Sequence, residues 1–153
     1  MTTSPDSTGA RKAENHRDCL MCGGRDPLSL RLRFRDMDDG TMTALFEAHP
    51  ALQGYDGILH GGLIGALLDA VMTHLLLHRG IPAMTAEIGI RYMKPVPCTG
   101  TTHLAARMDL ERPPLYRLRA ELRVGDTVHA TAVATFIYRE GRPGGRPLAF
   151  PGM

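Results

Sequence analysis

The chain has 153 residues, 43% of them hydrophobic and 22% charged, with a formal net charge of +2 at pH 7. This length predicts one globular domain with a hydrophobic core, and the composition is that of an ordinary soluble domain. Tryptophan is absent, other aromatic residues are scarce, and the arginines are scattered along the chain. Because base-stacking side chains and a run of positive charge are both missing, we expect no nucleic-acid partner.

The sequence also argues against a secreted or membrane-bound protein. Residues 1–15 are polar and lack the basic flank and apolar stretch of a signal peptide, so they predict a disordered leader. The longest apolar run, residues 63–77, is interrupted by polar side chains and is short for a membrane span, so we expect no membrane partner. Three cysteines, an odd count, favour a reducing, cytoplasmic location over a disulfide framework.

Alternating apolar and polar residues predict strands on both sides of one long helix. Residues 28–34 predict a half-buried strand, Asp38-Asp39-Gly40 a hairpin turn, and residues 42–46 the second strand of that hairpin. An almost entirely apolar run predicts a helix over residues 61–78. Four later runs alternate in the same way and predict strands over residues 84–93, 101–110, 115–124 and 127–138.

These elements together define a fold class. An antiparallel sheet has to cover one face, and the single helix is the only element able to do so. The sequence therefore predicts an α+β domain over residues 16–140, in which one long central helix is wrapped by a curved antiparallel sheet of five to six strands, the hot-dog fold. Residues 141–153 are rich in glycine and proline and predict an irregular C-terminal tail.

The start of the helix carries the chemistry. A glycine-rich turn ends at His60, and the helix begins at Gly61-Gly62, where unpaired backbone N–H groups and the positive end of the helix dipole favour an oxyanion. Asp69 lies among apolar residues a little over two turns later, and a carboxylate in such a place needs a partner or a role. An oxyanion donor and a desolvated carboxylate together indicate acyl-transfer or hydrolysis chemistry.

Three motifs resemble a known family. His60-Gly61-Gly62 is followed after six residues by Asp69, and the chain also contains Cys19-Leu20-Met21-Cys22-Gly23 and Arg91-Tyr92-Met93-Lys94-Pro95-Val96. Over roughly residues 19–139 this pattern resembles the hot-dog acyl-CoA thioesterases, and most of all their phenylacetyl-CoA thioesterase-like branch.

The resemblance implies roles for individual residues. The Gly61 N–H would polarise the thioester carbonyl, and Asp69 would act as general base or nucleophile across a subunit interface. Thr85 falls where relatives place a Ser or Thr that orients the attacking water. Some relatives carry an Asn six residues before the histidine, where this chain has Gly54, and the neighbouring Gln53 would have to replace that contact.

Substrate binding is predicted around the same turn and at the end of the next strand. Gly62 and Tyr55 lie beside the helix start, and Arg91 and Lys94 follow in the third motif. Arginine and lysine are suited to phosphates, so these two residues are candidates for holding the phosphates of CoA, with Arg117 and Arg119 as further candidates. Each of these four cations could equally be a solvated strand residue.

Several residues also have a plain structural interpretation. Asp69 could be a buried acid bonded to the backbone or to Thr73 one turn later, and the glycines at the helix start could simply allow close packing. His60 at the helix N-cap is expected to order the turn rather than move protons. Cys98 has no base nearby in the sequence, so it is not expected to act as a nucleophile.

A metal site is not expected. Cys19 and Cys22 form one CxxC with His16 three residues earlier, but a structural zinc ion normally takes four ligands, and the chain has no second CxxC. His74 and His78 are spaced i, i+4 near the end of the helix, where they fit partners of the helix dipole better than a metal face.

The sequence thus predicts a cytoplasmic acyl-CoA thioesterase that converts an acyl- or aryl-acyl-CoA to free acid and CoA without a cofactor. The protein is expected to be a homodimer, associating as a dimer of dimers. Two alternatives stay open: a non-catalytic acyl-CoA binding or sensing module, and a hot-dog enoyl-CoA hydratase or dehydratase.

Overall fold

The computed structural model describes residues 16–138. The expectations of a disordered leader over residues 1–15 and an irregular tail over residues 141–153 lie outside the described residues. In chain order the elements are β1 (Phe34–Asp36), β2 (Met42–Glu47), the short 3-10 helix η1 (Pro50–Leu52), α2 (Gly61–His78), β3 (Ala83–Tyr92), β4 (Thr101–Arg112), β5 (Leu115–Val124) and β6 (Thr127–Tyr138).

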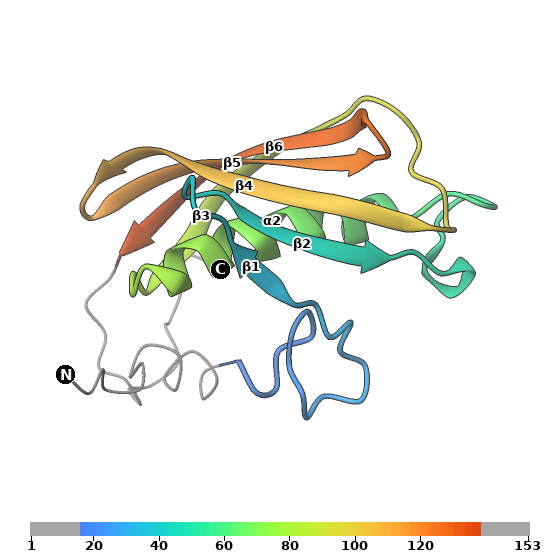
Figure 1. Ribbon diagram of the computed structural model, residues 1–153, viewed down its shortest axis with the longest axis horizontal. Helices are drawn as coiled ribbons and strands as arrows, with labels where there is room; N and C mark the ends of the chain where they lie inside the picture. Colours follow the sequence, from blue (N-terminus) through green and yellow to red (C-terminus); the bar gives the residue numbers. More distant parts are fainter. Residues whose placement is uncertain (1–15, 139–153) are drawn as a thin grey trace, which may run out of the picture.

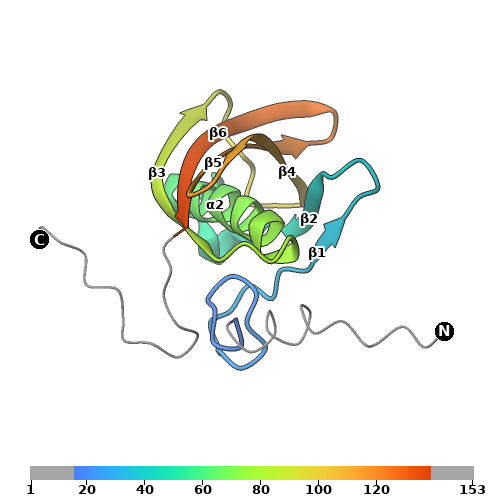
Figure 2. The same cartoon turned by 90° about the vertical axis from the view of Figure 1, so that its left-hand side faces the viewer.

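The strands form one sheet that curves around α2. All neighbouring strands are antiparallel, in the order β1-β2-β4-β5-β6-β3, so β1 and β3 are the two edges. The sheet is not closed: it arches over one side of α2, and the segment before β1 lies on the opposite side of the helix (Figures 1 and 2). This arrangement confirms the predicted α+β hot-dog fold, with six strands.

The central helix α2 spans Gly61–His78, the bounds predicted from the sequence. Its chain reverses just after the end at Gly80, whose φ of 72° is a left-handed conformation that favours glycine. The buried side chains occupy more than one side of the helix, namely Ile64, Leu67, Leu68, Ala70, Val71, Met72, His74, Leu75 and Leu76. Burial around much of the circumference explains why the helix is apolar on most of its sides rather than amphipathic.

By length and composition α2 could also cross a membrane, since its 18 residues have a mean hydropathy of 1.4. The expectation that this run is too short for a span is therefore wrong by that criterion. Half of the stretch is buried inside the fold, and the core helix of a soluble protein meets the same criterion. The packing thus accounts for the hydropathy of α2 without a membrane.

The predicted strand over residues 28–34 is mostly wrong. Regular pairing begins only at Phe34, and Leu28 is 76% exposed. Arg31 has a φ of 52°, a left-handed conformation that interrupts an extended strand. The backbone N–H groups of Leu30 and Leu32 instead donate to the carbonyls of the preceding segment, at Leu20 and Met21. Apolar alternation alone could not reveal this local pairing.

The predicted hairpin turn between β1 and β2 is confirmed. Gly40 has a φ of 81°, and the backbone N–H of Thr41 donates to a carboxylate oxygen of Asp39 at 3.0 Å. This backbone hydrogen bond holds the pKa of Asp39 below its ordinary value.

Strand β3 contains an irregularity that decides which side chains face the helix. Its register against β6 shifts between Thr85 and Glu87, which marks a β-bulge. After the bulge, Ile88 and Ile90 are partly buried and pack on the core. A strand without a bulge would place Thr85 on the face opposite to these isoleucines, because side chains alternate with a period of two. The bulge therefore turns Thr85 toward α2.

Close approach of α2 to β3 requires glycine at position 65. A Cβ on Gly65 would lie 2.9 Å from Cδ1 of Ile90, which is shorter than a normal carbon–carbon contact. The end of the isoleucine side chain therefore occupies the space that a larger helix residue would need.

We expect the effect of Gly65→Ala on stability to depend on the residue at position 90. In Ile90→Val, which lacks Cδ1, the alanine should raise the free energy of unfolding by up to about 1 kcal/mol, the helix-propensity gain over glycine. With Ile90 present, the steric conflict should cancel most or all of that gain. Urea denaturation of the four proteins measures the coupling, and an equal effect of Gly65→Ala in both backgrounds would contradict the proposed contact.

Candidate active site

The structure brings Asp69 and Thr85 together. The Thr85 hydroxyl donates to Oδ1 of Asp69 at 2.6 Å, and both residues are half-buried. Asp69 is therefore held by β3 across the helix–sheet interface rather than by Thr73 on its own helix, as the structural alternative had it. Because a single donor occupies one carboxylate oxygen, the other oxygen and its lone pairs stay available to a ligand.

The start of α2 is capped by its own histidine. Nδ1 of His60 accepts from the backbone N–H of Gly62 at 2.9 Å, so the predicted N-cap role is confirmed. The N–H of Gly62 is thus used within the turn. Among the described residues no hydrogen bond is recorded from the N–H of Gly61, which is the amide positioned to bind a ligand.

The turn before α2 forms a hollow at this helix end. The hollow has a volume of about 430 Å³ and is lined by Gln53, Gly54, Tyr55, Leu59, His60 and Gly61. The Gln53 side-chain oxygen accepts from the backbone N–H of Gly57 at 3.1 Å, which leaves its amide NH₂ for a ligand. Tyr55 is 84% exposed, so its ring is accessible at the rim.

The space around position 54 favours glycine, which the sequence did not reveal. A Cβ at this position would lie 3.3 Å from Cα of His60, so the turn packs against the helix cap. The φ of Gly54 is not in the left-handed region. A larger residue would therefore press on the backbone of His60 rather than strain its own.

Tyr92 is a site residue that the sequence analysis missed. Its hydroxyl donates to the carbonyl of Gly61 at 2.8 Å, and its ring faces the position where a Gly61 Cβ would be. The period of two that runs through Ile88 and Ile90 could have indicated this position, since it places Tyr92 on the helix-facing side of β3. The bond ties the end of β3 to the start of α2.

The residues predicted to bind the phosphates of CoA differ in whether another side chain already pairs with them. Arg91 and Lys94 are exposed at the end of β3, beside the helix start that Tyr92 contacts. Arg119 instead directs Nε at both carboxylate oxygens of Asp109, at 2.8 and 2.9 Å. A guanidinium engaged in this way is a weaker candidate for a phosphate than the two exposed cations.

A second hollow, of about 720 Å³, lies over β4, β5 and β6 on residues that include Arg107, Arg119 and Arg123. Arg123 pairs with Glu121 at 2.6 Å, which raises the pKa of this arginine, and Arg119 pairs with Asp109. Two of its three arginines are therefore already engaged by carboxylates. The smaller hollow at the start of α2 is the better candidate, because it contains the amide of Gly61.

The two halves of the candidate site are well separated within one chain. Asp69 follows Gly61 by eight residues, which corresponds to about 12 Å along a helix that rises 1.5 Å per residue. A carbonyl bound at Gly61 therefore cannot be attacked with the help of Asp69 from the same chain, since reacting groups have to come within about 3–3.5 Å. One chain therefore does not bring the N–H of Gly61 and the carboxylate of Asp69 to the same point.

Comparison with known proteins finds matches to the segment that contains these residues. The model of the thioesterase superfamily matches residues 56–109, the segment that contains the helix start, Asp69 and Thr85. Acyl-coenzyme A thioesterase THEM4 of Bos taurus is 31% identical over 107 residues, which are 68% of this chain and 44% of the bovine protein. The chain thus spans less than half the length of this relative.

Solved structures show the same fold. A thioesterase superfamily protein covers 89% of this chain, and 86% of its own chain is covered, with a TM-score of 0.74 and 19% identity. A putative thioesterase from Ralstonia eutropha, described as phenylacetic acid degradation-related, has a TM-score of 0.66 and 22% identity, covering 84% and 97% of the two chains. A hypothetical thioesterase protein from Streptococcus pneumoniae, solved with coenzyme A, has a TM-score of 0.67 and 16% identity, covering 72% of this chain and 88% of its own.

The fold, the helix start and the matched segment all lead to one assignment. The chain has the hot-dog fold, and its residues 56–109 match the model of the thioesterase superfamily.

Proposed function

We propose that this protein hydrolyses an acyl-CoA thioester to the free acid and CoA. The observation that carries the proposal is the short hydrogen bond from Thr85 to Asp69, which holds a lone carboxylate in place on an otherwise apolar helix. Burying part of a carboxylate in such surroundings lowers stability unless it is compensated, so a role in chemistry accounts for its presence. Relatives named acyl-coenzyme A thioesterases support the same reaction.

Asp69 acts in this proposal as the general base. Its Oδ2 removes a proton from a water molecule while that water attacks the thioester carbonyl, and the resulting carboxylic acid later returns the proton to the departing CoA thiolate. Thr85 orients the carboxylate through Oδ1. Attack by the carboxylate itself, through an anhydride that water then hydrolyses, uses the same geometry.

Gly61 supplies the electrophilic half of the site. Its N–H lies at the first position of α2, where the helix dipole adds positive potential, and it would donate to the oxygen that becomes negative in the tetrahedral intermediate. The Tyr92 hydroxyl on the Gly61 carbonyl and the His60 cap on Gly62 fix the orientation of this peptide.

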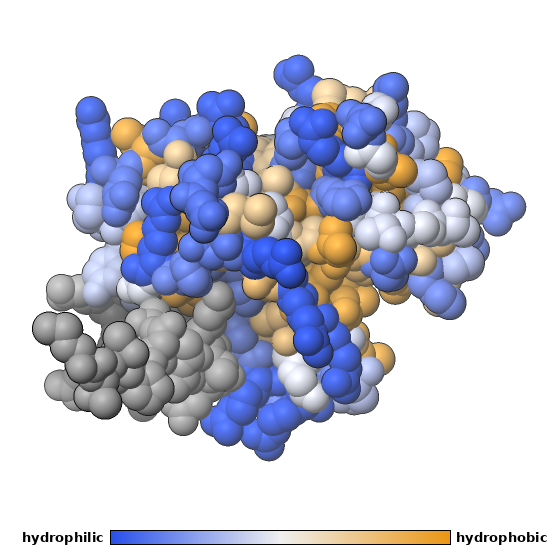
Figure 3. All heavy atoms as spheres, in the orientation of Figure 1, coloured by the Kyte–Doolittle hydropathy of each residue, from blue (hydrophilic) through white to orange (hydrophobic). Residues whose placement is uncertain are grey.

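A twofold axis through β3 would complete the site. Among the described residues β3 is an edge strand of the sheet, and exposed apolar side chains lie at or just beyond its two ends, at Met84, Tyr92 and Met93. On the face of the molecule shown in Figure 3, hydrophobic and hydrophilic residues are interspersed. An antiparallel pair of two β3 strands would place the Thr85 end of one chain beside the Tyr92 end of the other. Thr85 holds Asp69 and Tyr92 holds Gly61, so each dimer would contain two complete sites.

We therefore propose a homodimer as the catalytic unit, with association into a dimer of dimers as the further expectation. Pairing would also cover an edge strand of ten residues, which soluble proteins rarely leave open. Arg91 and Lys94 would lie near the helix start of the same chain, where they are placed to bind the phosphates of CoA.

The acyl group is the least constrained part of the proposal. Structures related in fold were solved with coenzyme A or acetyl-CoA, and one is described as phenylacetic acid degradation-related. These descriptions support a CoA thioester and are compatible with an aryl-acyl group from the phenylacetyl-CoA thioesterase-like branch. All three cysteines are thiols, which is the state that a reducing cytoplasm maintains, and the proposed chemistry requires no cofactor.

The two alternative functions make different demands on the site. A hydratase would need a base at the acyl chain, and His60 is poorly suited because its Nδ1 caps α2. A binding or sensing module would need no oriented carboxylate, so the hydrogen bond between Asp69 and Thr85 would have no role in its function. The substitution of Gly54 for an Asn found in some relatives is the feature that favours the binding module.

Thiol release from a panel of acyl-CoAs tests the reaction and the role of Asp69. Asp69→Asn should keep the fold but lower kcat by about 100-fold or more, because a near-isostere replaces the base. Thr85→Val should lower kcat by at least about 10-fold, since it removes a hydrogen bond to a charged group, whereas Thr85→Ser should stay within about threefold.

Thr73→Val is the matched control for these variants, since Thr73 lies one turn after Asp69 on the same helix and outside the proposed machinery. It should leave thiol release within about threefold of the parent protein. Asp69→Asn activity within threefold of the parent would contradict the catalytic assignment, and tight binding of acyl-CoA without thiol release by the parent would favour the binding module.

Substitutions of His60 distinguish a role in capping the helix from a role in proton transfer. His60→Asn should retain both stability and thiol release, because asparagine is a good N-cap. His60→Ala should lower the free energy of unfolding by about 1 kcal/mol, the usual cost of losing a cap. If His60→Asn is as stable as the parent yet loses thiol release by 100-fold, the histidine carries protons and the proposed division of roles is incorrect.

Mixed dimers test the shared site. Gly61→Pro removes the N–H proposed to bind the oxyanion, and the first turn is where proline disturbs a helix least. A heterodimer of Gly61→Pro and Asp69→Asn has one doubly altered site and one intact site. With about half of the dimers mixed, activity should recover to roughly a quarter of the parent level. Two folded variants that exchange subunits without recovery would place both groups in one chain.

A further inference from the structure

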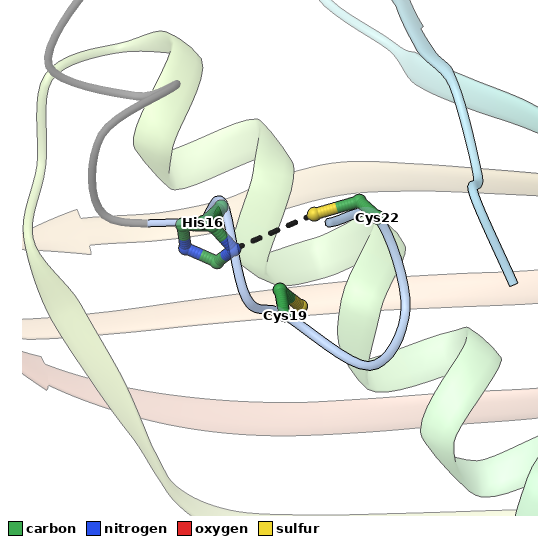
Figure 4. Close-up of side chains that lie close together, drawn as sticks. All are labelled: His16, Cys19 and Cys22. Carbon is green, nitrogen blue, oxygen red and sulfur yellow. Dashed lines mark hydrogen bonds between the residues drawn. The ribbon is translucent and has the colours of Figure 1, made fainter. Parts of the chain in front are cut away.

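The segment before β1 folds into a compact turn that gathers three potential metal ligands. The ligand atoms of His16, Cys19 and Cys22 all lie within 4.8 Å of one another, and their side chains converge on one point (Figure 4). Nδ1 of His16 lies 3.5 Å from Sγ of Cys22. This cluster is remote in sequence from Asp69 and Gly61 and is not used in the proposed hydrolysis.

The core helix adds a fourth potential ligand. Nε2 of His74, on α2, lies 3.2 Å from Sγ of Cys22, although the two residues are 52 positions apart. The ring centroids of His16 and His74 are 5.2 Å apart. His74 thus borders the cluster of His16, Cys19 and Cys22 from a separate part of the chain, and a small movement of the turn would bring all four ligand atoms around one ion.

Two of the distances are close to those between ligands of a tetrahedral zinc ion. Zinc bonds of about 2.3 Å to sulfur and 2.0–2.1 Å to nitrogen hold neighbouring sulfur and nitrogen ligands about 3.6 Å apart. The contacts from Cys22 Sγ to His16 and His74, at 3.5 and 3.2 Å, are close to this value. Two imidazoles bound to one tetrahedral ion hold their ring centres about 5 Å apart, as the histidines here do.

The backbone of the turn is built around the thiols. The N–H of Met21 donates to Sγ of Cys19 at 3.4 Å and so fixes the position of this sulfur. The N–H of Gly23 donates to the Cys19 carbonyl at 2.7 Å. A Cβ on Gly23 would lie 2.5 Å from the Arg17 carbonyl oxygen and 2.6 Å from Cys19 backbone atoms, so only glycine permits this tight turn.

The orientation of His74 is also fixed. Its side chain is only 5% exposed, and Phe34 of β1 stacks on its ring with centroids 3.7 Å apart and planes 11° from parallel. A histidine at this depth of an apolar helix loses hydration, and metal coordination would compensate for that loss. A pre-oriented ring lowers the entropy lost on binding an ion.

We propose that His16, Cys19, Cys22 and His74 bind one Zn²⁺ ion in a structural Cys₂His₂ site. Four protein ligands fill a tetrahedral ion and leave no position for substrate, so the ion would hold structure rather than take part in hydrolysis. It would join the segment before β1 to α2 on the side that the sheet does not cover. The metal-free expectation above depended on the lack of a fourth ligand, and His74 removes that argument.

Metal content and cobalt spectroscopy test the site directly. Protein purified under reducing conditions in zinc-supplemented medium should contain about one zinc ion per chain by elemental analysis. After chelation, Co²⁺ should give the intense visible bands and the sulfur-to-cobalt charge-transfer band of a tetrahedral ion with two thiolates. Removal of zinc should lower Tm by at least about 5 °C, and added Zn²⁺ should restore it.

Ligand variants with matched controls define the ligand set. Cys19→Ser and His74→Gln should each lower zinc content to below about 0.2 per chain, and chelation should then leave their Tm unchanged. Cys98→Ser and His103→Gln replace a cysteine and a histidine far from the cluster in the chain, and both should keep about one zinc ion. Should a ligand variant fail to fold, chelation and cobalt binding of the parent protein still decide the proposal.

Three results would overturn the proposal. The first is less than 0.2 zinc per chain in the parent protein together with no cobalt bands after reconstitution. The second is full zinc content in His74→Gln, which would exclude the fourth ligand. The third is a count of only one thiol, rather than three, in parent protein denatured without reductant, because Cys19 and Cys22 would then be a disulfide.

Discussion

A helix that is apolar around most of its circumference has to be covered on every side, and the rest of this structure depends on that constraint. The sheet covers one side of α2, and its curvature brings both edges, β1 and β3, down around the helix (Figure 2). The segment before β1 covers the opposite side through Cys22, which contacts His74. A partner subunit at β3 would complete the enclosure, in keeping with the proposed dimer.

The sequence was sufficient to predict the elements that depend on local periodicity. The helix bounds from Gly61 to His78 and the four later strands follow from apolar spacing, because each element repeats its contact with the core along its length. The His60 cap follows from its position before the first helical turn. The strand expected over residues 28–34 failed because the left-handed Arg31 and pairing with the preceding segment override alternation there.

The sequence was insufficient for contacts between distant segments. The pairing of Thr85 with Asp69 was not predicted, because the family resemblance gave Thr85 only the role of orienting the attacking water. A bulge of one residue decides the face on which Thr85 lies, and a period of two cannot show it. The hydroxyl of Tyr92 on the Gly61 carbonyl is a contact of the same kind. His74 and Cys22 meet because the segment before β1 folds back under α2, and no spacing rule connects residues so far apart in the chain.

Asp69 and His74 show how one apolar helix can serve two purposes. They are five residues apart, and at 100° per residue their side chains leave α2 about 140° apart, toward different neighbours. Asp69 meets Thr85 of β3, at the edge where a second chain would add its helix start. His74 meets Cys22 of the preceding segment, on the side that the sheet leaves open. Each polar group is compensated by a partner from another element, so the rest of the helix can keep the apolar surface that the fold requires. The same helix thereby carries both the carboxylate proposed for hydrolysis and the imidazole proposed as a zinc ligand. The zinc site would then stabilise the packing of α2 without taking part in the reaction, because it lies on one side of the helix and leaves the other side free to contact the partner subunit.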